Sequence, residues 1–283
     1  MTIRRLILSG LLALCVLTLV LPGGAGWAAD VTTAPFLRIE TGRHSARINR
    51  VAVDAAARIA ATVSNDKTLR LWTRDTGEPL GVLRVPMEAG DEGALYAVAL
   101  SPDGTTAVAA GNTGSAWDGS TALYLFDLKA LRLKGRLPGQ PQVLNDLAYS
   151  PDGRFVAGAF GGTAGVRVWD SATFRLVAED TNYGARTVAV AFDAAGRLAA
   201  ASFDGTVRLY GPDFTPLARY TAPGGGQPAA VAFSPDGTLL AVGYADAPRV
   251  EVLSAQTLEP LFTPEPGGGT AGSVTIESAQ PVI

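Results

Sequence analysis

Short apolar runs separated by turn residues dominate the chain from residue 44 onward. Between His44 and Trp72, three such runs occupy residues 51–53, 59–63 and 69–72. Each run is too short for a helix and is bounded by turn-forming residues, which is typical of strands. This stretch therefore predicts three consecutive β-strands.

The same pattern returns four more times along the chain. The first residues of the first turns are Asp54, Ser101, Ser150, Asp193 and Ser234, which gives spacings of 47, 49, 43 and 41 residues. A period of this size, with about four strands in each unit, is typical of a β-propeller. We expect an all-β fold, a β-propeller of four-stranded antiparallel blades with five complete repeats and part of a sixth.

Two local motifs recur in register with this period. Ser-Pro-Asp-Gly occupies residues 101–104, 150–153 and 234–237, and degenerate versions occupy 54–57 and 193–196. Pro and Gly at the second and fourth positions suit a type I turn, and we expect each Asp to cap its own turn. The predicted third strands are residues 69–72, 123–126, 166–169, 207–210 and 250–253. Their side chains alternate in character, as a strand with two unequal faces requires.

These motifs resemble the WD-repeat β-propeller family, in its bacterial, exported form, over roughly residues 36 to 276. Trp169-Asp170 is the dipeptide that gives the family its name. The resemblance implies that His44, Asp66 and Trp72 form a buried hydrogen-bonded set in the first blade. The hydroxyl group of this set would come from either Thr62 or Ser64.

The other blades carry this set incompletely. The fourth keeps Asp204 and Ser202 but has Tyr210 and no histidine, and the third lacks both the Asp and the His. We therefore expect these blades to be stabilised more by apolar packing and less by buried hydrogen bonds. We expect Trp72→Ala to destabilise the first blade by about 3–5 kcal/mol.

The first 28 residues predict a secretory signal peptide. Arg4 and Arg5 precede an apolar run over 6–21, and Gly26 and Ala28 supply the small residues of a cleavage site. The alternative is an uncleaved membrane anchor, although the apolar run is short for one. We expect a periplasmic or secreted protein that has no membrane contact after cleavage.

The two ends of the repeat region leave the closure of the ring open. Residues 36–40 have a strand-like alternation and would supply an outermost strand that closes the last blade. Residues 273–276 resemble the first strand of a sixth unit, and 277–283 form a tail. We interpret the chain as part of a longer propeller protein; the alternative is a ring of five blades with a C-terminal tail.

Charge and composition exclude several classes of function. The net charge is −3, and without residues 1–28 the chain has 21 Lys and Arg against 26 Asp and Glu. Such a chain has no basic surplus to neutralise phosphates, so nucleic-acid binding is not expected. The single cysteine, Cys15, lies in the signal segment, so we expect no disulfide.

We find no arrangement of residues that indicates catalysis. His44 is the only histidine, and one imidazole without Cys or clustered carboxylates does not make a zinc site. The glycine-rich pieces lack the Lys-Ser/Thr and the following helix that phosphate binding requires. We therefore expect a non-enzymatic chain without a metal or cofactor.

One loop stands out as a candidate site for binding other proteins. Residues 111–121, GNTGSAWDGST, replace the short turn of the other blades and carry Asn112, Trp117 and Asp118. Aromatic side chains beside small polar residues often anchor protein contacts. The alternative is that Trp117 folds back onto its own blade. Loops equivalent to this one contain Tyr183, Phe203 and Tyr244, to which both interpretations apply.

The predicted function is an interaction scaffold that binds other proteins through loops on one face of the propeller. The rival hypothesis is a small-ligand binder or an enzyme that uses the central channel. That hypothesis requires convergent carboxylates, histidines or a cofactor cradle. The sequence fixes neither the partner nor the oligomeric state.

Overall fold

The computed structural model describes residues 42–88, 90–115 and 119–264. They belong to one compact unit that spans 37–283. The predicted signal segment 1–28, the strands at 36–40 and 273–276 and the tail 277–283 lie outside the described residues. Within the described ranges, no helix has the length and apolarity needed to span a bilayer.

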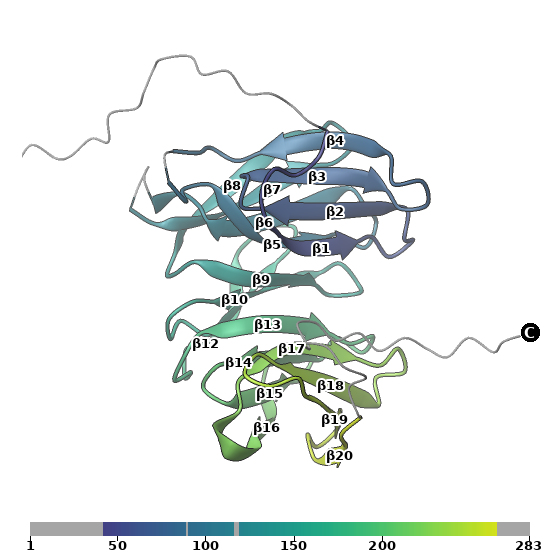
Figure 1. Cartoon of the computed structure of the whole chain (residues 1–283), viewed down its shortest axis with the longest axis vertical. Helices are drawn as coiled ribbons and strands as arrows, with labels where there is room; N and C mark the ends of the chain where they lie inside the picture. Colours follow the sequence, from purple (N-terminus) through teal and green to yellow (C-terminus); the bar gives the residue numbers. More distant parts are fainter. Residues whose placement is uncertain (1–41, 89, 116–118, 265–283) are drawn as a thin grey trace, which may run out of the picture. The chain divides into compact units, whose positions relative to one another are not determined.

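The described residues form five four-stranded antiparallel sheets, in which each strand pairs with its neighbour in sequence (Figure 1). The first sheet contains β1 (Ile48–Val53), β2 (Ile59–Ser64), β3 (Thr68–Thr73) and β4 (Pro79–Arg84). The second contains β5 (Ala94–Leu100), β6 (Thr106–Asn112), β7 (Thr121–Asp127) and β8 (Arg132–Gln140). The third contains β9 (Leu144–Tyr149), β10 (Phe155–Phe160), β11 (Val166–Asp170) and β12 (Leu176–Asp180).

The last two sheets follow the same plan. The fourth contains β13 (Thr187–Phe192), β14 (Leu198–Ser202), β15 (Thr206–Tyr210) and β16 (Pro216–Thr221). The fifth contains β17 (Pro228–Phe233), β18 (Leu239–Tyr244), β19 (Val250–Ser254) and β20 (Pro260–Phe262). A 3₁₀ turn, η1 (Pro223–Gly225), lies between β16 and β17. The all-β expectation and the four-stranded antiparallel unit are confirmed.

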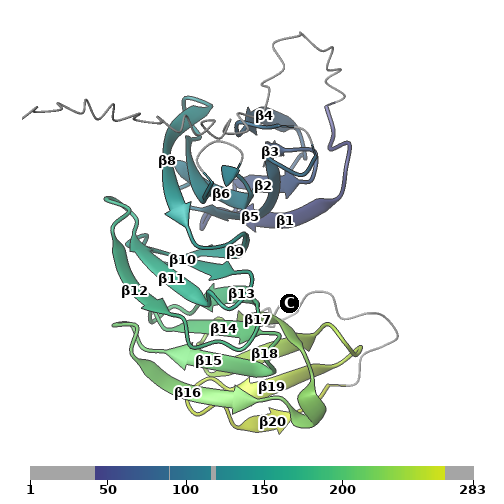
Figure 2. The ribbon, with the colours of Figure 1, turned by 90° about the vertical axis from the view of Figure 1, so that its left-hand side faces the viewer.

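Each sheet packs face to face on the next one in the chain. β1 contacts β5, β5 contacts β9, β9 contacts β13 and β13 contacts β17 (Figures 1 and 2). These first strands of the sheets therefore lie side by side, as the innermost strands of a propeller do. Among the described residues, extensive strand contacts between sheets join only consecutive sheets.

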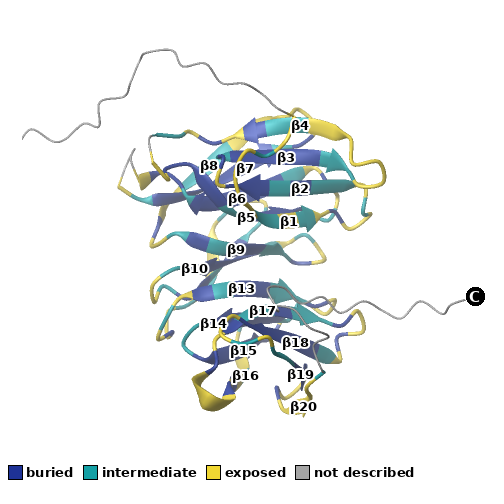
Figure 3. Ribbon diagram, viewed as in Figure 1, coloured by how far each residue is buried: buried dark blue, intermediate teal, exposed yellow. Residues whose placement is uncertain are grey.

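The core consists of four apolar clusters that occupy the spaces between neighbouring sheets. Alanine on the middle strands, such as Ala61, Ala107 and Ala199, is fully buried and lets the sheets approach closely. Exposure rises toward the outermost strands; β4, β8, β12, β16 and β20 carry most of the exposed strand positions (Figure 3). Because neighbouring sheets supply both walls of each cluster, no sheet buries its core face alone.

The Ser-Pro-Asp-Gly turns have the geometry expected from the sequence. In the second sheet the Ser101 hydroxyl donates to Asp103 Oδ1 (2.6 Å), which also accepts the N–H of Thr105 (3.0 Å). The corresponding Asp152 and Asp236 carboxylates accept the same pair of bonds. These hydrogen bonds lower the pKa of Asp103. Each aspartate caps its own turn, as expected.

The two degenerate turns replace this motif with an aspartate–arginine pair. In the fourth sheet Asp193 Oδ1 accepts the N–H of Arg197 (2.7 Å), and Arg197 Nε pairs with Asp193 Oδ2 (2.7 Å). The same guanidinium donates to the carbonyl oxygens of Gly237 (2.6 Å) and Ala255 (2.5 Å) in the fifth sheet. These turns therefore also connect neighbouring sheets, which the sequence pattern did not indicate.

Candidate partner-binding site

The loops at one end of the first two sheets contact one another. In an antiparallel sheet, the loop between the second and third strands lies at the same end as the loop that precedes the first strand. Lys67, between β2 and β3, donates from Nζ to the carbonyl oxygen of Glu88, between β4 and β5 (2.6 Å). This bond joins the loop between β2 and β3 to the connection that leads from the first sheet to the second.

A buried glutamate holds one side of the loop between β6 and β7. Glu92 is 7% exposed and accepts hydrogen bonds from the N–H of Gly114 and from the Ser115 hydroxyl (2.6 Å). On the other side, the Ser120 hydroxyl accepts the N–H of Gly139 (3.0 Å). The loop is thus fixed at both ends, although it is longer than the corresponding turns.

Glycine is required at position 114 of this loop. Gly114 has a φ of 96°, and a Cβ there would lie 2.8 Å from the carbonyl oxygen of Ser120 and 2.7 Å from the Arg136 guanidinium. Both its backbone conformation and its close packing therefore exclude a side chain. Asn112, the last residue of β6, is partly buried, and its carbonyl accepts the N–H of Gly93 (2.7 Å). Trp117 and Asp118 lie outside the described residues.

Phe203, like Asn112, is a predicted contact residue that stays partly accessible. It is partly exposed in the loop between β14 and β15, and the Arg186 guanidinium carbon lies 4.4 Å from its ring centroid. Arg186 is exposed and belongs to the loop that precedes β13. A cation stacked on an aromatic ring at the surface forms a small amphipathic contact site.

Tyr183 and Tyr244, which were candidate partner contacts, do not project from the surface; of the two interpretations, the one in which the ring folds back holds for both. Tyr183 is 4% exposed and Tyr244 is 1% exposed. The Tyr244 hydroxyl donates to Glu251, and the Arg249 guanidinium lies 3.9 Å from the Tyr244 ring centroid. Loop position alone did not reveal that both rings turn inward and stack on arginines, with the Tyr244 hydroxyl bonded to a carboxylate and the Tyr183 hydroxyl to Tyr210.

In the first sheet, the structure brings His44, Asp66 and Trp72 together around Thr62. The ring nitrogens of His44 lie 2.9 Å from Asp66 Oδ2 and 2.8 Å from Thr62 Oγ1. Trp72 Nε1 donates to the same Thr62 oxygen (2.8 Å). Ser64 instead accepts the N–H of Asp66 (3.0 Å). Both His44 nitrogens are therefore occupied within the sheet.

The fourth sheet builds an equivalent set with different side chains. Asp204 accepts the N–H of Gly184 (3.1 Å) and the Thr206 hydroxyl (2.6 Å), as Asp66 accepts Ser45 and Thr68 in the first sheet. Tyr183 lies four residues before β13, as His44 lies four residues before β1. Tyr183 thus occupies the position of the missing histidine.

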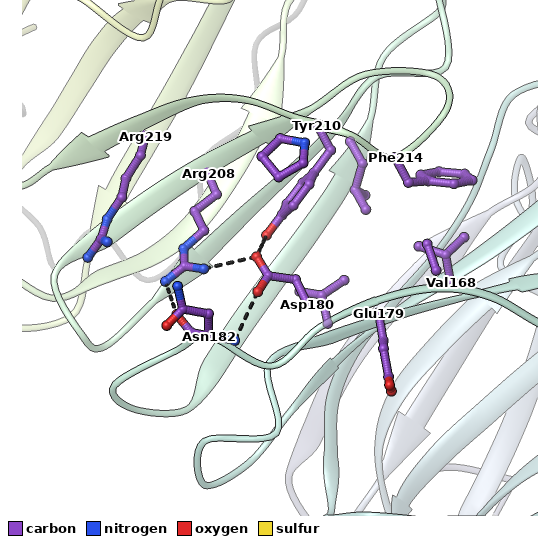
Figure 4. A pocket seen from close by; sticks show the side chains of 12 residues that line it. Val168, Glu179, Asp180, Asn182, Arg208, Tyr210, Phe214 and Arg219 are labelled. Carbon is purple, nitrogen blue, oxygen red and sulfur yellow. Dashed lines mark hydrogen bonds and ion pairs between the residues drawn. The ribbon is translucent and has the colours of Figure 1, made fainter.

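A polar cluster extends this set toward the third sheet (Figure 4). Tyr210, at the position of Trp72, donates its hydroxyl hydrogen to Asp180 (2.6 Å), so the Tyr183 hydroxyl donates to Tyr210 (2.8 Å). Arg208 pairs with Asp180 (2.9 Å) and stacks on Tyr183, 3.7 Å from its ring centroid. Burial alone would raise the pKa of Asp180, but its bonds from Tyr210, Asn182 and Arg208 lower it.

This cluster borders a cavity of about 340 Å³ between the third and fourth sheets. Val168, Phe214 and Leu198 form apolar parts of its wall, and Asp180, Tyr210 and Arg208 lie at its polar side (Figure 4). Sequence reasoning missed this cavity. The available signal was Asp180, which occupies an inward position of its outermost strand where the first sheet has Leu83.

A second cavity, of about 430 Å³, is bordered by the first strands of the first three sheets. Arg50 on β1 pairs with Asp146 on β9 (3.2 Å), and Asp146 also accepts the N–H of Val190 on β13 (3.1 Å). Burial raises the pKa of Asp146, against the effects of Arg50 and two backbone N–H groups. Across the described parts of the chain, no cluster of three or more His, Cys, Asp or Glu side chains could hold a metal ion.

Trp169, the tryptophan of the Trp-Asp dipeptide, lies deep in the third sheet. It is 2% exposed and packs against Phe160, with 6.1 Å between the ring centroids. Trp72 is only partly buried, since its face of the first sheet carries no further sheet among the described residues. The two tryptophans are therefore not equivalent in packing.

Comparison with known protein families agrees with the repeat geometry. Residues 37–73, 131–170 and 181–211 match the WD40 family model, described as WD domain, G-beta repeat. The matched segments contain the first three strands of the first, third and fourth sheets, together with β8 of the second, and support the WD-repeat family. No curated protein matched the chain significantly. WD40 repeats generally indicate a propeller that serves as a scaffold for protein interactions.

Proposed function

We propose that the chain is a non-catalytic scaffold that binds a partner protein through the loops beside Glu92. The observation that carries this proposal is the fixed base of the loop between β6 and β7. Its first end is held by Glu92, which precedes β5 and accepts hydrogen bonds from Gly114 and Ser115. Its second end is held by Gly139 of β8, which donates to the Ser120 hydroxyl. A loop fixed at its base loses less conformational entropy when it binds. The WD40 matches support the same class of function.

Co-purification with a matched pair of variants tests this proposal. The tagged chain is expressed in its native host, and associated proteins are quantified by mass spectrometry for wild type, Trp117→Ala and Leu217→Ala. Leu217 is 54% exposed on β16, away from these loops, so it controls for the loss of an exposed apolar side chain. We expect a specific protein to be recovered with wild type and Leu217→Ala but several-fold less with Trp117→Ala.

Thermal melting of the three proteins must accompany this experiment, because a destabilised variant loses partners for an unrelated reason. Equal recovery of every associated protein with wild type and Trp117→Ala at equal stability would contradict the proposed site. If only Leu217→Ala lost the partner, the result would indicate that the partner binds the outer strands instead of the loops.

A second candidate function is small-ligand binding at the cavity bordered by β1, β5 and β9. The observation that favours it is the pairing of Arg50 with the buried Asp146 at that cavity. Charged groups with perturbed pKa values beside a cavity often mark binding sites. A screen of metabolites for increased melting temperature tests it; a hit that Arg50→Gln abolishes would favour this function over the scaffold.

We also propose that the protein is exported by the segment over residues 1–28. The support is the order of Arg4 and Arg5, the apolar run and the small residues that end at Ala28. The intact mass of the protein recovered from the native host should correspond to a chain that begins at Ala29. A mass that retains residues 1–28 would contradict cleavage.

A further inference from the structure

Three aliphatic side chains on β1 are exposed although they occupy core positions of the repeat. Ile48, Val51 and Val53 are 53%, 61% and 54% exposed. Together they form an apolar strip along one face of the first sheet, which we call the β1 strip. Apolar strips of this kind commonly mark an interaction surface.

The other four sheets show what such positions contact. Val53 and Val51 lie one and three residues before the first turn, at Asp54. In the second sheet the same positions hold Leu100 and Val98, which are 5% and 2% exposed and pack against the first sheet. In the later sheets the position of Val51 holds Leu147, Val190 and Val231, all of them buried. Each of these residues packs on the sheet that precedes its own.

The repeat also identifies the surface that covers such a strip. In the first interface, Ala52 and Ile59 of the first sheet belong to the same cluster as Val98 and Leu100. The equivalent residues of the fifth sheet are Ala232 and Leu239, which are only partly buried. On the same face, Phe262 is 55% exposed. We call this set the β17–β20 face; within the described residues no further sheet packs on it.

We propose that the β1 strip binds the β17–β20 face of a second copy of this chain. The two surfaces are complementary because each has the residues that meet at the four interfaces inside one chain. Among the described residues of one chain, the first and fifth sheets share no extensive contact, since such contacts join consecutive sheets. The contact is head-to-tail, so two different surfaces meet and a ring or a longer assembly can form.

Cysteine cross-linking distinguishes this contact from its alternatives. In a Cys15→Ser background, Val51→Cys and Ala232→Cys are purified separately, mixed and oxidised. Val51 is equivalent to Val98 and Ala232 is equivalent to Ala52, and Val98 and Ala52 belong to one apolar cluster at the first interface. We expect covalent dimers in the mixture and only traces in either variant alone. Leu217→Cys, which is equally exposed on β16, should not link to Val51→Cys.

The remaining outcomes each contradict the proposal. If a chain that carries both cysteines gives a cross-linked monomer and the mixture gives no dimer, the fifth sheet binds the first sheet of its own chain. Dimers from Val51→Cys alone would indicate that two β1 strips face each other. If no linkage occurs, the two surfaces do not meet.

The mass of the assembly in solution provides an independent test. By light scattering at tens of micromolar protein, we expect wild type and Leu217→Asp to form dimers or larger species. Val51→Asp together with Val53→Asp should be monomeric and keep the wild-type circular dichroism spectrum, because both side chains are exposed. A monomeric wild type over this concentration range would overturn the proposal.

Discussion

At the scale of single residues, different side chains build the buried hydrogen-bonded set of the first and fourth sheets. The first sheet joins Asp66 and Trp72 through His44 and Thr62, whereas the fourth uses Asp204 with two tyrosines. In both sheets the aspartate accepts a backbone N–H from the segment before the first strand. The feature common to the two sheets is therefore the aspartate carboxylate. The side chain before the first strand is a histidine in one sheet and a tyrosine in the other.

The tyrosine cluster makes a testable contribution to stability. Tyr210→Phe removes the hydroxyl that donates to Asp180 and accepts from Tyr183, so we expect a loss of about 1–3 kcal/mol at neutral pH. Asp180 has a lowered pKa in the folded state, so its bonds stabilise above its usual value of 3.8 and are lost as pH falls through the lowered pKa.

Urea unfolding of wild type and Tyr210→Phe between pH 3 and pH 7 measures both effects. The difference between them should shrink at the acidic end. Tyr149→Phe is the control, since no hydrogen bond of its hydroxyl is found among the described residues; it should change stability by less than about 0.5 kcal/mol. Equal losses for the two variants would contradict the assigned role of Tyr210.

The two tryptophans give a second residue-scale prediction, which revises the sequence expectation for Trp72. Trp169 is buried between the second and third sheets, so Trp169→Ala should cost about 3–5 kcal/mol. Trp72→Ala should cost less, because the side chain is only partly buried. Chemical denaturation of both variants measures the difference; a larger loss for Trp72→Ala would show that another surface covers the first sheet in solution.

At the scale of elements, the strands and the intact turns were predictable, whereas contacts between sheets were not. The period and the alternation of the third strands placed β3, β7, β11, β15 and β19, because local side-chain pattern decides a strand. The inward turn of Tyr183 brings its hydroxyl to Tyr210, 27 residues further along the chain, and its ring to Arg208, both on β15. The local sequence pattern does not indicate which distant residues a side chain will contact. The candidate loop between β6 and β7 was identified by its length, but its anchor Glu92 was missed because it lies in another connection.

The degenerate turns give a prediction at this scale. The Arg197 side chain is 13% exposed, and its guanidinium bonds to one carboxylate and two carbonyl oxygens. We therefore expect Arg197→Gln to lower the free energy of unfolding by about 2–4 kcal/mol. Arg58 occupies the same position in the first sheet, but its side chain is 64% exposed. Arg58→Gln should therefore cost less than about 1 kcal/mol. Thermal and urea unfolding of the two variants measure these losses. Equal losses of stability for Arg197→Gln and Arg58→Gln would contradict the prediction.

At the scale of the whole molecule, Asp146 connects three sheets through Arg50 and the N–H of Val190. Its pKa is raised in the folded state, chiefly by burial. The folded protein therefore binds a proton more tightly than the unfolded chain, and this group lowers stability as pH rises from about 3.8 through the raised value. Asp146→Asn removes that dependence.

The expected result is that the stability of wild type relative to Asp146→Asn decreases as pH rises through this interval. Urea unfolding of both proteins at closely spaced pH values between 4 and 8 measures it, since other titrating groups are common to both. A relative stability that is constant, or that increases with pH, would show that burial does not raise the pKa of Asp146 in the folded protein.

The central claim is that the loops fixed by Glu92 form the surface that binds a partner protein. Hydrogen–deuterium exchange of the full chain, with and without the co-purified partner, tests it most directly. The account expects new protection over residues 86–93 and 113–121, with no change in the turns at 54–57 and 150–153 at the opposite end. Protection of those turns, or of the outer strands alone, would contradict the claim.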